Sequence, residues 1–335
     1  MSELPTQLVD RFGRKVTYVR MSITDRCDFR CVYCMDEEMT FMPREKLLTL
    51  EEIVFLLRTF CELGVEKIRI TGGEPLVRRN VDWLFEQVGR LKQSTSLSEL
   101  TLTTNGSQLP KYAEALARAG VDRINISLDS LDPEKFRALT RTGDLAQVLK
   151  GIEAAKQAGF KRIKLNAVIM KGRNEDEVID LAEFAIENEM DISYIEEMPL
   201  GQVDHLRSES YCSSDEVLEK LQTRFDLQPS IASTGGPSRY FQMANTDSRI
   251  GFISPHSHNF CSSCNRVRVT TEGRLLLCLG QEHSMDLRDI IRRFPGDMDR
   301  LKQAIVKSMD IKPEGHDFDI EAKPVIFRHM SVTGG

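Results

Sequence analysis

Six of the eight cysteines fall into two groups, and each group has the spacing of metal ligands. The first group lies in CDFRCVYC, where Cys27, Cys31 and Cys34 are spaced C-x3-C-x2-C with no histidine or further cysteine close by. A closed structural zinc site takes four ligands, so a triplet either recruits a distant ligand or leaves one metal position open. Three thiolates can hold three irons of a [4Fe–4S] cluster and leave the fourth iron open. We interpret the first group as such an open cluster, whose last position binds a small molecule.

The second group is spaced C-x2-C-x13-C and consists of Cys261, Cys264 and Cys278. Three histidines lie near it in the sequence: His256, His258 and His283. The spacing alone therefore leaves a Cys3His zinc site and an auxiliary [4Fe–4S] cluster both open. The stretch NRVR follows Cys264 directly and contains Arg266 and Arg268. Two arginines beside a metal suit an anionic or hydrogen-bonding ligand, which favours the cluster.

The remaining cysteines, Cys61 and Cys212, stand alone and are expected to be small buried thiols. The first fifteen residues contain acids and lack an apolar segment, so they resemble neither a secretory signal nor a transit peptide. No stretch has the roughly 18 apolar residues of a membrane span. We therefore expect a cytoplasmic protein, in which cysteines serve as metal ligands or free thiols rather than as disulfides.

Composition indicates a globular enzyme. The 335 residues are 41% hydrophobic and 29% charged, with a formal net charge of -6. This charge gives no global field for nucleic acid, although a local basic pocket for a phosphorylated small molecule remains compatible with it. We expect two regions, at 1–200 and 201–335.

The region up to residue 200 alternates short β-branched segments with longer helical ones. The expected strands are 16–24, 67–73, 99–106, 123–130, 161–170 and 191–199. The expected helices are 49–64, 80–93, 110–120, 145–159 and 174–189. This order predicts an α/β fold of parallel β/α units, which could form a barrel, a partial barrel or an open doubly wound sheet. In each of these folds the chemistry gathers at the carboxyl ends of the strands.

Unusual short sequences occupy those strand ends: TDRC, TGGEP, TTNG and SLDS. After about residue 200 the alternation stops, and turn residues and short segments predict a smaller irregular region that carries the second cysteine group. A last helix is expected at 298–309. The chain ends on Gly334 and Gly335, which by composition alone predicts a frayed terminus.

The spacing C-x3-C-x2-C, with Tyr33 before its last cysteine, resembles the radical S-adenosylmethionine superfamily. Together TDRCDFRCVYC, RITGGEPLVRR, TTNG, ISLDSL, FCSSCNRVRVTTEGRLLLC and the terminal Gly-Gly resemble, over nearly the whole chain, the GTP 3′,8-cyclase family of molybdenum cofactor biosynthesis. Asp36 is one departure, because many relatives have proline there.

The resemblance implies a partial (βα)6-type barrel whose C-terminal region carries a second cluster. It implies two [4Fe–4S] clusters and S-adenosylmethionine as cofactors, with a 5′-deoxyadenosyl radical taking hydrogen from the ribose C3′ of GTP. Attack of C3′ on guanine C8 then gives (8S)-3′,8-cyclo-7,8-dihydroguanosine 5′-triphosphate.

The resemblance also assigns residues. For S-adenosylmethionine it implies Tyr33, Gly73, Ser127 and Met198. For GTP it implies Arg20, Arg69, Thr103, Lys164, Arg266, Val267 and Arg268. It places Gly334 and Gly335 in the active site, where glycine can approach a ligand closely. Since the sequence has no G-x4-G-K-[ST] loop, side-chain cations must hold the phosphates.

The partners implied by the resemblance are a one-electron reductant and the next enzyme of the pathway, a cyclic pyranopterin monophosphate synthase; a homodimer is compatible with it. Two rival interpretations stay open. One is a peptide-modifying maturase of the same superfamily, and the other is a non-catalytic zinc or iron–sulfur protein with closed metal sites.

Overall fold

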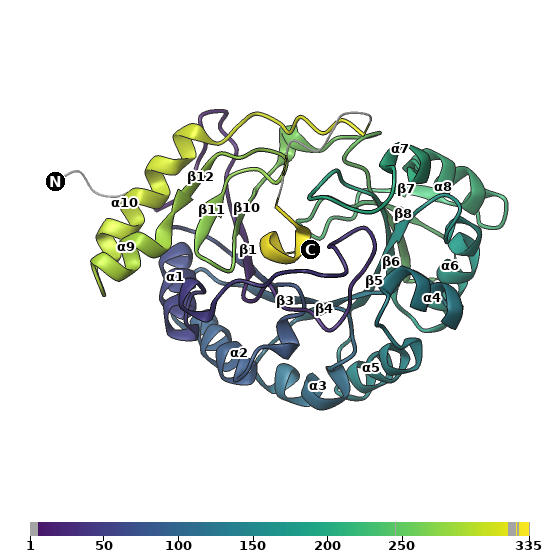
Figure 1. Cartoon of the computed structure of the whole chain (residues 1–335), viewed down its shortest axis with the longest axis horizontal. Coiled ribbons are helices and arrows are strands. Elements are labelled where there is room, and N and C mark those ends of the chain that lie inside the picture. Colours follow the sequence, from purple (N-terminus) through teal and green to yellow (C-terminus); the bar gives the residue numbers. More distant parts are fainter. Residues whose placement is uncertain (1–5, 245, 321–325, 327, 335) are drawn as a thin grey trace.

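The computed structural model describes residues 6–244, 246–320, 326 and 328–334, which form one curved sheet with helices around it (Figure 1). The strands are β1 (Tyr18–Ser22), β2 (Lys67–Thr71), β3 (Glu99–Thr104), β4 (Arg123–Ser127), β5 (Ile163–Ile169), β6 (Asp191–Glu196), β7 (Gln228–Ser230), β8 (Arg239–Gln242), β9 (Arg249–Ile253), β10 (Arg266–Val269), β11 (Arg274–Leu276) and β12 (Ser284–Asp286). Neighbouring strands follow the order β12-β11-β10-β1-β2-β3-β4-β5-β6-β9-β8-β7.

The strands from β10 through β1–β6 to β9 are all parallel, and helices cover their convex side (Figure 1). The helices are α1 (Leu50–Glu62), α2 (Val81–Arg90), α3 (Leu109–Arg118), α4 (Pro133–Thr140), α5 (Leu145–Gln157), α6 (Val178–Glu187), α7 (Arg207–Ser210), α8 (Ser214–Gln222), α9 (Leu287–Arg293), α10 (Met298–Ser308) and α11 (Met330–Thr333). Among the described residues β12 and β7 do not pair, so the sheet stays open. The prediction of a partial β/α barrel is confirmed.

Helix starts follow ordinary capping chemistry. Thr49 and Glu52 form a reciprocal capping box at the start of α1. Asp132 accepts hydrogen bonds from two backbone amides at the start of α4, and Asp144 accepts one, from Ala146 N, at the start of α5. The helix α4 was absent from the predicted elements because its eight residues stand between β4 and a longer helix, α5.

The chain after residue 200 is more regular than we expected. Strand β9 pairs in parallel with β6, and β10 pairs in parallel with β1, so this region extends both edges of the same sheet. Its strands are three to five residues long, too short for a clear alternating pattern. Helix α8 does carry a signal that we missed, the capping box of Ser213 and Glu216.

The two faces of the sheet differ in polarity. The residues that face the helices are apolar and buried, among them Val19, Ile68, Leu102, Ile126 and Leu165. The alternate residues are polar: Tyr18, Arg20 and Ser22 in β1; Lys67, Arg69 and Thr71 in β2; Arg123, Asn125 and Ser127 in β4. A closed β/α barrel fills its interior with branched apolar side chains. The polar inner face therefore indicates a binding chamber rather than a packed core.

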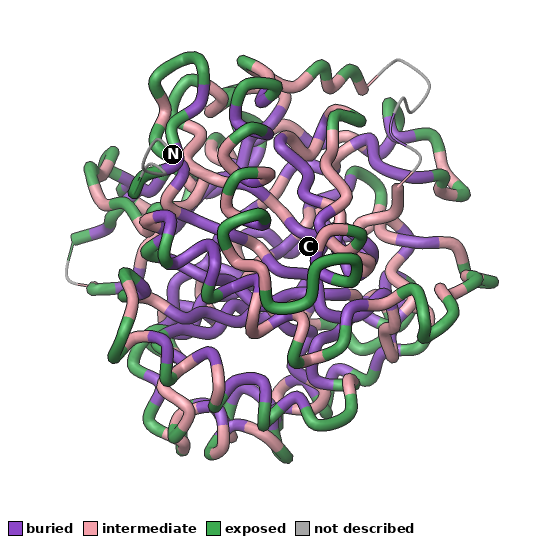
Figure 2. The backbone as a smooth tube through the Cα atoms, turned by 90° about the vertical axis from the view of Figure 1, so that its left-hand side faces the viewer, coloured by how far each residue is buried: buried purple, intermediate pink, exposed green. Residues whose placement is uncertain are grey.

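The C-terminal segment lies inside the curve of the sheet (Figures 1 and 2). Ser331, Val332 and Thr333 are buried there, so the chain is packed, not frayed, as far as Gly334.

The two lone cysteines, Cys61 and Cys212, are buried, as predicted. Within the described residues, no helix combines the length and the apolar character needed to cross a membrane.

Candidate active site

One cavity on the inner side of the sheet is lined by both cysteine groups. Most of the predicted site residues contribute to its wall: Arg20, Cys27, Cys31, Tyr33, Cys34, Gly73, Thr103, Ser127, Met198, Cys261, Cys264, Arg266, Val267, Arg268 and Cys278. Residues from distant parts of the sequence therefore meet in one chamber. Arg69, Lys164 and Gly334 are not part of its lining, and Gly335 lies outside the described residues.

The glycines of TGGEP hold the loop that leads to Cys27. The amide of Gly73 donates to the carbonyl oxygen of Thr24 at 2.7 Å, and Glu74 N donates to Arg26 O at 2.8 Å. A Cβ atom on Gly73 would lie 2.5 Å from the carbonyl oxygen of Arg26, and one on Gly72 would lie 2.7 Å from that of Thr24. Side chains are excluded at both positions because the two backbones touch.

The strand-end motifs fix the same loop from a second side. Asp28, next to Cys27, accepts hydrogen bonds from Asn105 Nδ2 and Ser107 Oγ, both at 2.6 Å. Asn105 N in turn donates to the buried Glu74 carboxyl at 2.6 Å. Burial raises the pKa of Glu74 to about 8. The motifs TTNG and GGEP thus form one network that positions the first cysteine group.

A third contact comes from SLDS. Tyr33 OH donates to Asp129 Oδ2 at 2.8 Å, and Val168 N donates to Asp129 Oδ1 at 2.9 Å. Burial raises the pKa of Asp129 to about 6. Asp129 was not among the predicted site residues, although its motif was. It holds Tyr33, and with it the loop of Cys31 and Cys34, against the ends of β4 and β5.

Burial also raises the pKa of the thiols in the first group, and that of Cys34 reaches about 12. Metal binding displaces such protons, because the thiolate is the ligand. Phe29 N donates to Cys27 Sγ at 3.3 Å, an amide placed to stabilise negative charge on that sulfur. These residues fit an iron–sulfur cluster in this loop.

The second cysteine group is held by two cations, the half-buried Arg14 and the buried Lys312. Arg14 donates to the carbonyl oxygens of Cys261 at 2.8 Å and Pro313 at 2.6 Å. Lys312, which is 1% exposed, lies 3.6 Å from Cys264 Sγ. Although burial raises the pKa of Cys264, the charges of Arg266 and Lys312 bring it below its ordinary value. The chain thus supplies positive charge where thiolates would accumulate.

The three histidines weighed as zinc ligands are engaged elsewhere. His256 Nε2 lies 3.0 Å from Glu197 O, His258 Nε2 lies 2.8 Å from Asp215 Oδ1, and His283 Nδ1 lies 3.2 Å from Gln281 Oε1. In the part of the chain that the structure describes, no three His, Cys, Asp or Glu side chains converge on a single metal position. A mononuclear zinc site needs such convergence, whereas the cysteines of a [4Fe–4S] cluster each hold a different iron.

Three arginines stand in a row on neighbouring strands, and two of them, Arg20 and Arg268, line the cavity. Arg268 of β10 pairs with Arg20 of β1, and Arg20 pairs with Arg69 of β2. Burial, followed by the charges of Arg69 and Arg266, lowers the pKa of Arg20 to about 10. The pKa of Arg268 is lowered in the same way, by burial first and then by Arg20. Crowding of like charges away from water favours an anionic ligand at this place.

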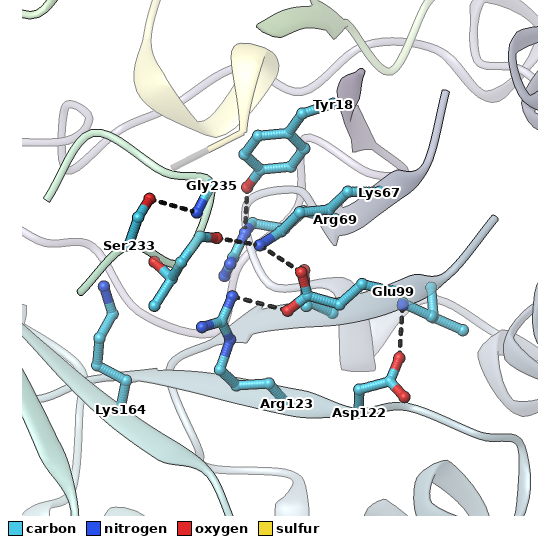
Figure 3. Close-up of polar contacts among 12 residues, drawn as sticks. Tyr18, Lys67, Arg69, Glu99, Asp122, Arg123, Lys164, Ser233 and Gly235 are labelled. Carbon is cyan, nitrogen blue, oxygen red and sulfur yellow. Dashed lines mark hydrogen bonds and ion pairs between the residues drawn. The ribbon is translucent and has the colours of Figure 1, made fainter. Parts of the chain in front are cut away.

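A second group of cations lies at the amino-terminal ends of the strands (Figure 3). This basal cluster comprises Lys67, Arg69, Arg123 and Lys164 with Tyr18. Arg69 Nε donates to Tyr18 OH at 2.5 Å, and Arg69 Nη1 donates to Thr103 Oγ1 at 3.1 Å, which links the basal cluster to the cavity wall. Burial opposes ionisation of Tyr18, but the charges of Arg69, Arg20 and Lys67 lower its pKa to about 7.

The basal cluster contains residues that sequence reasoning missed. Lys67 bonds to Glu99 Oε2 at 2.7 Å, and Arg123 bonds to Glu99 Oε1 at 2.8 Å. Tyr18 and Lys67 stand two residues before Arg20 and Arg69, and therefore on the same face of their strands. That spacing was the signal available in the sequence.

The C-terminal segment reaches the row of arginines. Arg268 Nη1 donates to the carbonyl oxygen of Gly334, whose φ is 80°. A Cβ atom on Gly334 would lie 1.9 Å from Thr71 Oγ1. Only glycine fits this position.

Comparisons with known proteins identify the family. The model of the Radical SAM superfamily matches residues 21–185, and that of Molybdenum Cofactor Synthesis C matches residues 190–318. The GTP 3′,8-cyclase of Marinobacter nauticus is 59% identical over 98% of this chain and 99% of that protein. That of Pseudomonas entomophila is 58% identical over the full length of both chains. The chain belongs to the GTP 3′,8-cyclase family.

Solved structures support the fold of this GTP 3′,8-cyclase family member. Streptococcus suis SuiB bound to S-adenosylmethionine matches with a TM-score of 0.60 at 17% identity, covering 86% of this chain and 66% of that one. SuiB bound to its precursor peptide SuiA matches with a TM-score of 0.57 at 19% identity, covering 85% of this chain and 67% of that one. Superfamily membership confirms the expected cofactor chemistry, which is that of S-adenosylmethionine and iron–sulfur clusters.

Proposed function

We propose that this protein converts GTP to (8S)-3′,8-cyclo-7,8-dihydroguanosine 5′-triphosphate, an early step of molybdenum cofactor biosynthesis. The observation that carries the proposal is the lining of the cavity, whose wall holds both cysteine groups together with Arg20, Arg266 and Arg268. Curated relatives of 55 to 59% identity carry the name GTP 3′,8-cyclase, which favours this reaction over peptide modification.

In this proposal Cys27, Cys31 and Cys34 hold the first cluster, and Cys261, Cys264 and Cys278 hold the second. Tyr33, Gly73, Ser127 and Met198, which line the cavity, contact S-adenosylmethionine. With S-adenosylmethionine bound, the first cluster supplies the electron that generates the 5′-deoxyadenosyl radical.

The inner face of the sheet receives GTP. Arg20, Arg266 and Arg268 face the nucleotide, and Arg266 Nε is a buried donor with no partner among the described residues. The basal cluster, including Arg69 and Lys164, draws the triphosphate toward the amino-terminal ends of the strands through its positive charge. The base then lies toward the second cysteine group.

The proposed reaction balances with two electrons from an external reductant: one, delivered through the first cluster, would cleave S-adenosylmethionine to methionine and the 5′-deoxyadenosyl radical, and the second would reduce the cyclised nucleotide radical. The hydrogen atom on C3′ is transferred to the 5′-deoxyadenosyl radical, which gives 5′-deoxyadenosine. A bond then forms between C3′ and C8, and one electron and one proton complete the dihydro product.

The same proposal includes three further points: the product passes to a cyclic pyranopterin monophosphate synthase, the protein works in the cytoplasm, and it assembles as a homodimer. The division of the chain at residue 200 also stays a prediction.

The test is formation of 5′-deoxyadenosine by anaerobically reconstituted protein supplied with S-adenosylmethionine and dithionite. GTP should stimulate it strongly, and ATP should not. Cys31→Ala should abolish it, whereas Cys212→Ala, which removes a lone buried thiol, should leave it unchanged. Formation that is indifferent to GTP would contradict the proposal and favour the maturase interpretation.

A further inference from the structure

A histidine that no motif singled out lies in the cavity wall beside the second cysteine group. His316 lines the cavity together with Phe260 and Phe318. Its ring centroid is 4.5 Å from that of Phe318 and 6.5 Å from that of Phe260. Arg266 lies over the Phe260 ring at 5.1 Å. Flat aromatic walls next to a cation suit a planar heteroaromatic ring.

The hydrogen bonds of His316 determine which nitrogen carries the proton. Phe318 N donates to His316 Nδ1 at 3.3 Å, so Nδ1 is unprotonated and Nε2 carries the hydrogen. Nε2 is buried and has no hydrogen-bond partner among the described residues. A buried N–H group without a partner costs free energy, so its survival in a cavity wall points to a ligand acceptor.

The segment that carries His316 is held rigidly. Arg14 donates to Pro313 O and Glu314 O, and Gln281 Nε2 donates to Gly315 O at 3.1 Å. Gly280 leaves room for it, because a Cβ atom there would lie 2.7 Å from His316 Cβ. The imidazole is therefore positioned before any ligand binds, which lowers the entropic cost of using it.

We propose that His316 is a base-positioning residue, which donates its Nε2 hydrogen to O6 of the guanine of GTP. The inference rests on the proposed function, which places the base toward the second cysteine group. Guanine and adenine share the acceptors N3 and N7, but only guanine has an acceptor at position 6, where adenine has an amino group. A fixed donor facing this position accepts GTP and disfavours ATP.

The experiment measures equilibrium binding of three nucleotides to the reconstituted full-length protein without S-adenosylmethionine. GTP and ITP both carry O6, whereas the triphosphate of 2-aminopurine riboside lacks it. His316→Phe keeps a flat ring without the donor, and His316→Gln keeps an N–H donor. The matched control is His258→Phe, since His258 is exposed and bonded to Asp215.

His316→Phe should weaken GTP and ITP roughly 3- to 10-fold, the range of one neutral hydrogen bond. It should leave the 2-aminopurine nucleotide unchanged, His316→Gln should recover part of the GTP affinity, and His258→Phe should change nothing. Iron and sulfide contents should stay at wild-type values.

Equal losses for all three nucleotides, or unchanged GTP affinity, would overturn the assignment of O6. Loss of iron in His316→Phe would overturn it as well, because His316 would then be a ligand of the second cluster. ATP binding to the wild-type protein is measured in parallel; if it equals GTP binding, the proposed function itself fails, and this inference fails with it. A wild-type preference for GTP that His316→Phe leaves intact removes only the inference.

Discussion

Replacing Gly334 by alanine tests whether the buried C-terminal segment belongs to the active site or only to the fold. The added Cβ would lie 1.9 Å from Thr71 Oγ1 and 2.9 Å from Thr71 Cβ. Thr71 ends β2 directly before the glycines of TGGEP, so it has little freedom to move. A side chain at a φ of 80° adds roughly 1–3 kcal/mol of backbone strain. The segment therefore cannot keep its place.

The free-energy cost is limited, because the segment can leave the cavity instead of distorting the sheet. We expect Gly334→Ala to lower the melting temperature by only a few degrees, about 2 °C per kcal/mol for a chain of this size. Since Arg268 loses its contact with the Gly334 carbonyl oxygen, GTP-dependent formation of 5′-deoxyadenosine should fall at least tenfold, the equivalent of about 1.4 kcal/mol.

The matched control is Gly296→Ala. Gly296 also has a positive φ, of 79°, but a Cβ there meets no atom within 4 Å. It should cost about 1–2 kcal/mol of stability and leave activity unchanged. Full activity in Gly334→Ala would refute the role given to the C-terminal segment. A melting temperature lowered by tens of degrees would show that the segment is a structural part of the core.

Three further predictions address the cations and the first cysteine loop. The pKa of Tyr18 is about 7 in the folded protein and 10.0 ordinarily, so its ionisation stabilises the folded state increasingly from pH 7 to 10. In urea unfolding, the free energy of unfolding of the wild-type protein should therefore rise over this range relative to that of Tyr18→Phe. Parallel pH dependences of the two proteins would contradict this prediction. In equilibrium dialysis Arg266→Met should weaken GTP binding roughly 10- to 100-fold, which corresponds to the loss of one charge-assisted hydrogen bond. The control is Arg118→Met, whose side chain is exposed on the surface, and it should leave GTP binding unchanged. Gly73→Ala should reduce the iron content of the first site, because the added Cβ collides with the preceding loop. Gly236→Ala should retain the iron, because a Cβ there has no atom nearer than 3.6 Å. Equal iron contents in the two variants would refute the argument that packing at Gly73 positions the first cysteine group.

Much of the architecture follows from local sequence signals. The strands β1–β6 follow from β-branched segments between amphipathic helices, and the position of TGGEP and SLDS at strand ends follows from their order. Spacing alone indicated metal ligands in both cysteine groups, and an open iron–sulfur cluster at the first. What the spacing left open, zinc or a cluster at the second group, depends on where His256, His258 and His283 lie, which is a tertiary property.

The parts that escaped prediction depend on long-range contacts. The pairing of β10 with β1 and of β9 with β6 joins segments far apart in the chain, and such short strands have no periodicity that reveals it. The sequence carries no signal for His316, because its unpartnered Nε2 is evident only in the folded cavity. The basal cluster is the exception: Tyr18 and Lys67 could have been found by following alternate residues along the strands.

The most direct test of the account is the fate of the hydrogen on the ribose of GTP. GTP deuterated at C3′ should be given to the reconstituted protein with S-adenosylmethionine and dithionite, and the mass of the 5′-deoxyadenosine formed should be measured by mass spectrometry. If the proposed reaction takes place, 5′-deoxyadenosine carries the deuterium and the nucleotide product has lost it. Unlabelled 5′-deoxyadenosine, formed beside GTP that keeps its label, would contradict the account.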